Sequence, residues 1–425
     1  MSIGGEVATD GGSADRGSMG EVSMGGASSG GRSTDEVSSD AVSSDAASSG
    51  EVSTLGVEEE FFLVDPDSGA VVAAGSRVVR RAREALGDLV SGEFTEYQVE
   101  GKTPPCATPG EVEGHLLRVR THLAAAAREE GLRIVASGTP VIEPGGPVPV
   151  RDDPRYRLGT LAYRAMADDF ALSALHVHVH LPDREHAILV GNHLRPWLPL
   201  LVAIAANSPF WRHRDTGYAS WRTVVAAQWP QAGPPPYLAG ADAYDALAAA
   251  LHETGATVDA GTLFWDVRPS AHLPTIEIRL MDATTDPRDA AAFSALVRAM
   301  VHTAHARVRR GDPGPALCDG LLRAAYWRAA RDGLSGHIPH PETGRLIPTG
   351  RLARELAHRL RPALERHGDW ATVTAATDRL TTHGGGAERQ RTAYARRGSL
   401  HDVVRHLCRH TIRAHADNGR TTVSP

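Results

Sequence analysis

Apolar and polar residues follow patterns typical of strands and helices from about Thr54 onward. An apolar run at 55–64 closes at the turn sequence Asp65-Pro66-Asp67-Ser68-Gly69, which predicts a strand. Strict alternation at 175–181 predicts a second strand, with leucine and valine on one face and histidine on the other. Further strands are expected at 93–99, 132–137, 264–268 and 275–282.

Helices are expected where a capping residue precedes apolar residues at helical spacing. Thr108-Pro109-Gly110-Glu111 has the form of a capping box and predicts a helix to Glu130, and Asp286-Pro287 begins another. The other expected helices are 76–85, 156–168, 183–206 and a C-terminal set to about 414, broken near 333–350 and 383–386. Because crossover helices do not regularly follow the strands, the pattern predicts an α+β fold with a largely antiparallel sheet and helices packed on one side.

The first 53 residues differ in composition from the rest of the chain. They consist mostly of glycine, serine, alanine and acidic residues, with imperfect repeats such as Glu21-Val22-Ser23 and Glu36-Val37-Ser38. Such a segment buries too little apolar area to offset its chain entropy. We therefore predict a disordered leader at 1–53 and a single catalytic domain at 54–425.

Charge and composition exclude several classes of partner. The formal net charge is −6, and acidic and basic residues are interspersed, so no nucleic-acid surface is expected. The apolar run 194–206 contains two prolines and is too short to span a bilayer, and the N-terminus lacks a signal pattern. Cys106, Cys318 and Cys408 are predicted to be free thiols. A cytoplasmic protein without a membrane partner follows, and its exposed sheet edges make a homodimer an open expectation.

The first strand carries the clearest candidate chemistry. Glu58 and Glu60 share one face of this strand, and Glu59 points the other way. Two neighbouring carboxylates on an apolar strand repel each other unless a cation lies between them, and a hard divalent metal suits them. The alternative is an exposed polar strand end.

Three further strands carry polar side chains that a core would not select. Their polar members are Glu96, Gln98 and Glu100, then His176, His178 and His180, then Thr275, Glu277 and Arg279. Four such faces predict an open sheet with a charged, hydrated concave side. Carboxylates with one or two histidines suit Mg²⁺ or Mn²⁺, whereas three histidines would suit Zn²⁺.

Two arginines complete the candidate site. Arg268 and Arg279 lie in or at the end of strands, where arginine is costly to bury without a partner. They either bind phosphate or carboxylate, or Arg279 forms a structural pair with Glu277. The chain has neither GxxxxGK[ST] nor a GxGxxG after a strand, so a nucleotide would have to be bound by metals and arginine.

Several longer motifs lie in a fixed order along the chain. They are Thr54-Leu-Gly-Val-Glu-Glu-Glu-Phe-Phe-Leu-Val-Asp65, His176-Val-His-Val179, Arg195-Pro-Trp-Leu-Pro199, Ala206-Asn-Ser-Pro-Phe-Trp211, Asp215-Thr-Gly-Tyr-Ala-Ser-Trp-Arg222, Trp265-Asp-Val-Arg-Pro269, Thr275-Ile-Glu-Ile-Arg-Leu-Met-Asp282 and Glu388-Arg-Gln-Arg391. Together these motifs resemble a known family, the bacterial carboxylate–amine ligases of the glutamate–cysteine ligase type 2 group. The resemblance runs from about Thr54 to the C-terminal helices.

The resemblance implies a glutamine-synthetase-like fold, in which a curved antiparallel sheet forms an active-site funnel for ATP and Mg²⁺. It also implies ATP-dependent amide formation through an acyl phosphate, with glutamate and an amine such as cysteine as nominal substrates. The implied metal ligands are Glu58, Glu60, Glu96, Glu100, His176 and Glu277. His178, Arg268 and Arg279 are implied to bind the nucleotide, and Arg268, Glu277 and Arg279 to act in catalysis.

Two positions depart from the family pattern and leave the substrates open. His180 stands where the family usually has glycine, and Gly101-Lys102-Thr103-Pro104-Pro105 is richer in proline than the usual sequence. Three alternatives to the ligase remain at this level: a zinc-dependent hydrolase using the histidine strand, a non-catalytic nucleotide or amino-acid binder, and a kinase on the same fold.

Overall fold

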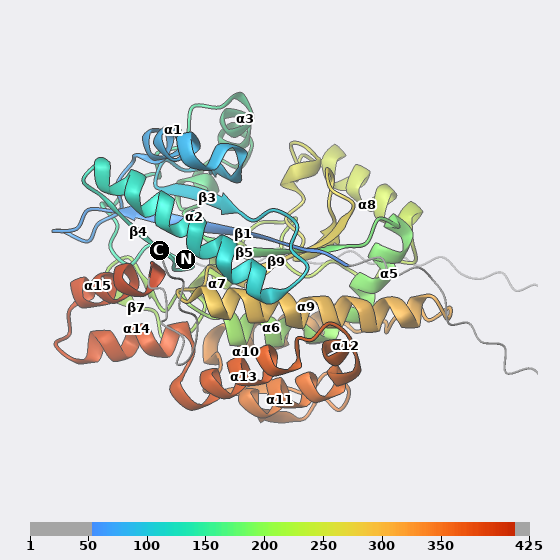
Figure 1. The fold of residues 1–425 in the computed structure, drawn as a ribbon. Helices are drawn as coiled ribbons and strands as arrows, with labels where there is room; N and C mark the ends of the chain where they lie inside the picture. The colour runs from blue at the N-terminus through green and yellow to red at the C-terminus, as the bar shows by residue number, and fades with distance from the viewer. Residues whose placement is uncertain (1–52, 413–425) are drawn as a thin grey trace, which may run out of the picture. The chain divides into compact units, whose positions relative to one another are not determined.

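The central element of the fold is an antiparallel sheet in which the expected strands lie side by side. The computed structural model describes residues 53–412, so the predicted disordered leader, except Ser53, lies outside the described residues. The strand order is β2-β3-β1-β5-β9-β8, with β4 also paired to β1, and every pair is antiparallel (Figure 1). The strands are β1 (Leu55–Val64), β2 (Val90–Gly92), β3 (Gln98–Lys102), β4 (Arg133–Val135), β5 (Ala174–His180), β8 (Val267–Pro269) and β9 (Thr275–Asp282). This sheet confirms the predicted α+β class.

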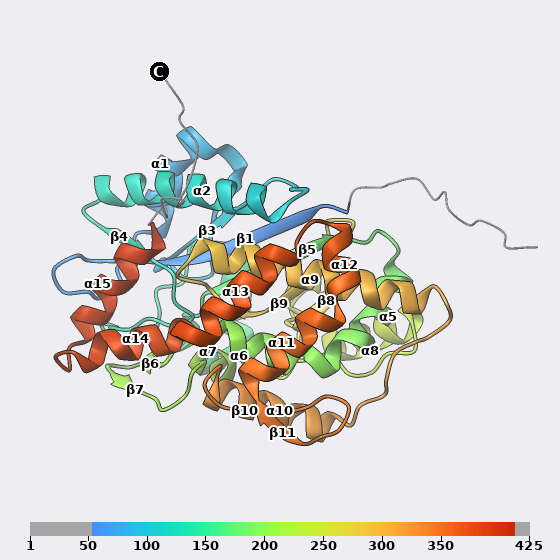
Figure 2. The ribbon, with the colours of Figure 1, turned by 60° about the horizontal axis from the view of Figure 1, so that its bottom comes forward.

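Apolar side chains on one face of the sheet pack against a layer of helices. Buried residues of β1, β5 and β9, such as Val57, Val177 and Ile278, belong to the same hydrophobic core as α5 (Arg184–Leu194), α6 (Leu198–Ala205) and α9 (Pro287–Val308). A second layer packs on α6 and α9 (Figure 1, Figure 2). Its helices are α10 (Asp319–Asp332), α11 (Thr349–Arg359), α12 (Arg361–Arg366) and α13 (Trp370–His383). The other face of the sheet is therefore left for the polar side chains.

One apolar segment of this layer has the length and composition of a membrane helix. Residues Arg184–Ala205 contain an 18-residue window with mean hydropathy 1.4, but 83% of that window is buried inside the protein. Such burial is typical of a core helix. In the structure the segment is divided into α5, a short 3-10 helix (Arg195–Trp197) and α6, in agreement with its two prolines.

Most predicted helices begin and end near the expected residues. Thr108 accepts a hydrogen bond from the backbone N–H of Glu111 and caps α2 (Pro109–Glu129), and Asp286 caps α9. The remaining helices and strands are α1 (Gly75–Leu86), α3 (Pro154–Tyr163), α4 (Ala165–Asp168), β6 (Phe210–Trp211), β7 (Arg214–Asp215), α7 (Trp221–Ala226), α8 (Ala241–Glu253), β10 (His337–Pro339), β11 (Leu346–Pro348), α14 (Gly386–Ala395) and α15 (Leu400–Thr411), with 3-10 turns at Gly87–Leu89 and Ala260–Thr262.

Two predicted elements differ from the structure. The strand expected at 93–99 is instead a turn between β2 and β3, and the sheet strand begins only at Gln98. The helix expected at 156–168 is divided at Arg164, whose φ of 52° lies in the left-handed region that ends a helix.

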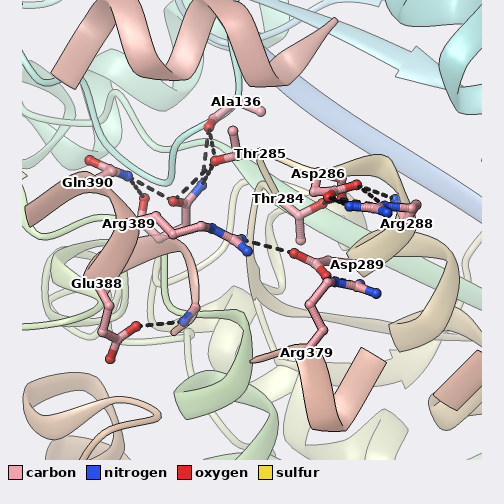
Figure 3. A network of polar contacts seen from close by, with 12 residues as sticks. Ala136, Thr284, Thr285, Asp286, Arg288, Asp289, Arg379, Glu388, Arg389 and Gln390 are labelled. Carbon is pink, nitrogen blue, oxygen red and sulfur yellow. Dashed lines mark hydrogen bonds and ion pairs between the residues drawn. The ribbon is translucent and has the colours of Figure 1, made fainter. Parts of the chain in front are cut away.

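A buried polar network ties the C-terminal helices to the sheet (Figure 3). Asp289 of α9 accepts hydrogen bonds from Arg379 of α13 at 2.5 Å and Arg389 of α14 at 3.0 Å. Gln390 donates to the side chain of Asn207 at 2.8 Å, and the Asn207 backbone donates to Asp282 at the end of β9. The Glu388–Arg391 motif is thus part of the structural support beneath the sheet.

Candidate active site

The polar face of the sheet lines one large cavity. Its volume is about 1180 Å³, and strands β1, β3, β5, β8 and β9 all contribute side chains to it. The opposite walls come from α3, α7 and α10 and from the segments 229–234 and 258–264. Apolar and aromatic side chains, including Phe94, Phe170, Trp229 and Phe264, line the part next to α3. A cavity that combines an apolar wall with a few converging charged groups is typical of a small-molecule site.

Strand register brings the predicted acidic residues together. Glu60 lies opposite Glu100 across β1 and β3, Glu58 opposite His176 across β1 and β5, and the next pair of strands places His178 opposite Glu277. Two overlapping groups have ligand atoms within 4.8 Å of one another and share His176. The first is Glu58, His176 and Glu277, and the second is Glu60, Glu100 and His176.

Burial and mutual repulsion change the ionisation of these carboxylates. Burial and the neighbouring Glu100 raise the pKa of Glu60 to about 8, and burial and Glu58 raise the pKa of Glu100. Burial opposes the ionisation of Glu277, but Arg279 and Arg268 lower its pKa overall. Ionising all of these carboxylates would therefore place more negative charge in the cluster than the nearby cations neutralise.

This arrangement fits a divalent cation. Buried carboxylates that repel one another gain most from a positive ion between them, and oxygen ligands with one imidazole suit Mg²⁺ or Mn²⁺. The Nε2 atom of His178 is buried without a hydrogen-bond partner among residues 53–412 and lies 3.8 Å from both Glu58 and Glu277. It is a further donor atom facing the same group.

Both predicted arginines face this cluster and bind Glu277. Arg279 forms an ion pair with one Glu277 oxygen, and Arg268 Nε donates to the other at 3.1 Å. Arg268 also donates to the carbonyl oxygen of Leu263 at 2.5 Å, so it supports the segment that forms the opposite wall. The structural pairing of Glu277 with Arg279 is thus present, and both guanidinium groups still line the cavity.

Glu96 is a correction to the predicted ligand set. It does not line the cavity, because its carboxylate accepts hydrogen bonds from the backbone and hydroxyl of Ser76 at the start of α1. The error follows from the misplaced strand, since alternation from Glu100 cannot continue through the turn that precedes Gln98. Glu93 lines the cavity instead, and burial together with Glu60 and Glu100 raises its pKa well above the ordinary value.

Lys102 is a second cavity residue that the strand pattern missed. It lies 2.7 Å from Glu100 and 3.7 Å from Glu58, at the edge of the acidic cluster. It belongs to the Gly101–Pro105 segment in which the sequence departs from the family pattern, and its position on the Glu58/Glu100 face was the available signal.

Glu59 has a structural environment that is separate from the cavity. It points to the opposite face of β1, where Arg120 of α2 donates to it at 2.9 Å and 2.5 Å. Arg120 also donates to the backbone carbonyls of Thr284, Thr285 and Thr411, and both members of the pair are fully buried. Sequence alternation placed Glu59 on the other face but did not identify Arg120.

The three-histidine site of the hydrolase alternative is not assembled. His176 and His178 line the cavity, whereas His180 does not. Within residues 53–412, the donor groups close enough to share a metal ion each contain His176 as their single histidine. The donor set is therefore mainly carboxylate, which suits Mg²⁺ better than Zn²⁺.

Comparisons with known proteins agree with the motifs and the fold. The family model for glutamate–cysteine ligase family 2 matches residues 54–407. A protein of Mycolicibacterium vanbaalenii named "Putative glutamate--cysteine ligase 2-2" is 45% identical over 83% of this chain and 96% of its own length. A "Putative glutamate--cysteine ligase 2-1" of Saccharopolyspora erythraea is 42% identical over 84% of this chain and 95% of its own length.

Solved structures share the fold at low sequence identity. A glutamate–cysteine ligase of Francisella tularensis, solved with AMP, has a TM-score of 0.60 at 12% identity and covers 85% of this chain and 89% of its own. The bifunctional glutathione synthetase of Pasteurella multocida has a TM-score of 0.59 at 16% identity, and the match spans 85% of this chain and about half of that one (51%). On the family match and its relatives, the chain belongs to glutamate–cysteine ligase family 2, a family of ligases that form carbon–nitrogen bonds.

Proposed function

We propose that this chain is an ATP-dependent carboxylate–amine ligase that joins glutamate to an amine, with cysteine as the nominal acceptor and γ-glutamylcysteine as its product. The observation that carries the proposal is the acidic cluster of Glu58, Glu60, Glu100 and Glu277, flanked by Arg268 and Arg279 inside one cavity. This combination suits the transfer of a highly charged phosphoryl group. Family membership supplies the reaction class.

The reaction has two steps that balance without a further reagent. The γ-carboxylate of glutamate attacks the γ-phosphorus of ATP, so that an acyl phosphate forms and ADP leaves. The amine nitrogen then attacks the acyl carbon, phosphate leaves, and the nitrogen loses a proton. Because the acyl phosphate reacts with water, a deep cavity also protects it until the amine arrives.

Each group of residues has a distinct role in this proposal. Glu58, Glu60, Glu100, His176 and Glu277 would bind Mg²⁺, which neutralises phosphate charge when bound. Arg279 faces the same space from β9 and orients phosphate oxygens through its guanidinium N–H groups. Arg268 contributes charge and fixes the opposite wall through Leu263. His178 offers its unpartnered Nε2 to the nucleotide or to the metal.

The direct test is phosphate release from ATP in the presence of Mg²⁺, glutamate and one amine at a time, beginning with cysteine. The proposal expects release only when both substrates are present, with the dipeptide detected by mass spectrometry. Release of phosphate with another amine would support the ligase reaction and identify a different acceptor. ATP binding without release for every carboxylate–amine pair would support the non-catalytic alternative and overturn the proposal.

A glutamate series tests the residues. Glu60→Ala and Glu277→Ala are expected to fold and to lower ATP turnover by about 10²-fold or more, because each removes a proposed metal ligand at the site of phosphoryl transfer. Glu96→Ala is the matched control, because Glu96 was also predicted to bind the metal but lies outside the cavity. Wild-type turnover in folded Glu60→Ala, or an equal loss in Glu96→Ala, would contradict the assigned cluster.

A further inference from the structure

A second part of the cavity wall carries polar groups that the proposed reaction steps do not use. Asp266, Arg222 and Tyr326 line it, and they come from the segment before β8, from α7 and from α10. Asp266 and Arg222 belong to sequence motifs that the strand-face argument left without a role. Their position next to the acidic cluster suggests that they contact a substrate.

Strand register places Asp266 close to the reacting groups. Arg268 lies opposite Glu277 across β8 and β9, and the backbone N–H of Arg279 donates to the Asp266 carbonyl at 2.8 Å. Asp266 therefore lies two residues before Arg268 along the same strand direction, on the face that lines the cavity. Two residues of extended chain span roughly 7 Å, a distance that a small molecule reacting at the cluster can bridge.

Polar atoms in this part of the wall lack partners. Asp266 Oδ2, Tyr326 Oη and Arg222 Nε are all buried without a hydrogen-bond partner within the described part of the chain. Buried polar side chains are nearly always hydrogen-bonded, so three such atoms in one wall call for a ligand. The two terminal nitrogens of Arg222 donate to the carbonyls of Leu280 and Arg279, both at 3.1 Å, which fixes the guanidinium group in place.

The charges of this wall select the chemistry of that ligand. Burial raises the pKa of Asp266 to about 6, so its carboxylate is ionised at neutral pH. Burial and the neighbouring Asp266 raise the pKa of Tyr326 well above its ordinary value, so its hydroxyl keeps its proton. The wall thus offers an anionic acceptor in Asp266, a cationic donor in Arg222 and a neutral hydroxyl. A zwitterion complements this set, because its ammonium and carboxylate groups find opposite charges in the same wall of the cavity.

We propose that Asp266 binds the ammonium group of an amino-acid substrate, with Arg222 and Tyr326 completing the subsite. The inference rests on the proposed function for the identity of the substrates. The ammonium group is that of the carboxylate donor or that of the acceptor, and both present the same chemistry to Asp266. Arg222, held through its terminal nitrogens, directs its free Nε–H toward the carboxylate of the same molecule.

Binding of matched ligand pairs to the full chain tests this subsite without turnover. Calorimetric titration with Mg²⁺ and a non-hydrolysable ATP analogue would compare glutamate with glutarate, and cysteine with 3-mercaptopropionate; each second ligand lacks only the ammonium group. The wild-type chain is expected to prefer the ammonium-bearing member of one pair by at least about tenfold. Asp266→Asn is expected to abolish that preference. A change in the glutamate–glutarate pair would assign the subsite to the carboxylate donor, and a change in the cysteine–mercaptopropionate pair would assign it to the acceptor.

Further variants separate the subsite from an effect on folding. Asp266→Asn keeps the shape of the side chain and an oxygen that can accept from the neighbouring Tyr326 hydroxyl, and circular dichroism checks its fold. Asp266→Glu keeps the charge but moves it by one methylene group, and it is expected to reduce the preference. This variant replaces Asp266→Asn in the test if the asparagine variant does not fold. Asp245→Asn on α8, whose carboxylate is paired with Arg184 outside the cavity, is expected to keep the wild-type preference.

The outcomes for the subsite and for the ligase differ. If folded Asp266→Asn keeps the wild-type preference, or if the wild-type chain prefers neither ammonium-bearing ligand, the subsite is overturned. If the wild-type chain releases no phosphate with any carboxylate–amine pair, the proposed ligase function is overturned. The binding preference for the ammonium group still decides the role of Asp266.

Discussion

At the residue scale, three adjacent glutamates on one strand have different environments. Glu59 lies against Arg120 in the core, whereas Glu58 and Glu60 face the cavity with His176 and Glu100. Strand alternation alone separates the structural glutamate from the two functional ones. The motif at the start of β1 therefore contains one glutamate that stabilises the fold and two that belong to the candidate site.

This separation predicts opposite effects for two isosteric substitutions. Glu59→Gln removes one member of a buried ion pair and leaves Arg120 without its countercharge, so the free energy of unfolding is expected to fall by about 3–5 kcal/mol. Glu60→Gln is expected to keep its stability within about 1 kcal/mol and to lose turnover, because the raised pKa already keeps Glu60 largely neutral at pH 7 and glutamine retains an acceptor for the Ala174 N–H. Denaturant unfolding and ATP turnover of both variants provide the check. Equal stability losses would contradict the two environments.

The raised pKa of Glu60 also predicts how stability depends on pH in a chelating buffer. The ordinary value is 4.5 and the folded value is about 8, so between these limits the folded chain retains a proton that the unfolded chain releases. Stability from this group is complete below 4.5 and is lost as the pH rises toward about 8. Unfolding measured from pH 5 to 8 is expected to show a decline that is weaker in Glu60→Gln. The same pH dependence in wild type and Glu60→Gln would contradict the shift.

At the element scale, local signals predicted helices better than strands. Thr108, Asp183 and Asp286 are capping residues that act within one turn, and the helices that follow them begin as expected. The strand carrying Glu100 depends on pairing with β1 and β2, which are distant in sequence, so the predicted start was wrong by several residues. That shift placed Glu96 in the site and left Glu93 out. Arg120 and Tyr326 were not predicted for the same reason, because each lies on a helix that meets the sheet only in the folded chain.

Asp289 of α9 is paired with arginines of two C-terminal helices, and its contribution to stability can be tested. Asp289 is buried and accepts hydrogen bonds from Arg379 and Arg389 (Figure 3). Asp289→Asn weakens two charge-assisted hydrogen bonds and is expected to lower the free energy of unfolding by about 2–3 kcal/mol. Hydrogen exchange is expected to rise first in α13 and α14. Asp378→Asn, at an exposed pair with Arg354, is the matched control, and an equal effect there would contradict the special role of Asp289.

At the scale of the whole molecule, the sheet brings carboxylates from distant parts of the sequence into one cluster. The fold alone does not remove the repulsion between these carboxylates when they are ionised. A cation that binds only the folded chain then stabilises it in proportion to the logarithm of its concentration. Addition of Mg²⁺ to chelator-treated protein, to about ten times its dissociation constant, is expected to stabilise the chain by about 1.4 kcal/mol and to raise the midpoint of thermal unfolding by a few degrees. Glu277→Gln is expected to lose this response because Glu277 belongs to one of the two ligand groups, whereas Glu96→Gln keeps it. An equal midpoint shift in Glu277→Gln and wild type would place the stabilising cation elsewhere, and then the carboxylates of this cavity would have to be neutralised by protons and by the substrate's own charges.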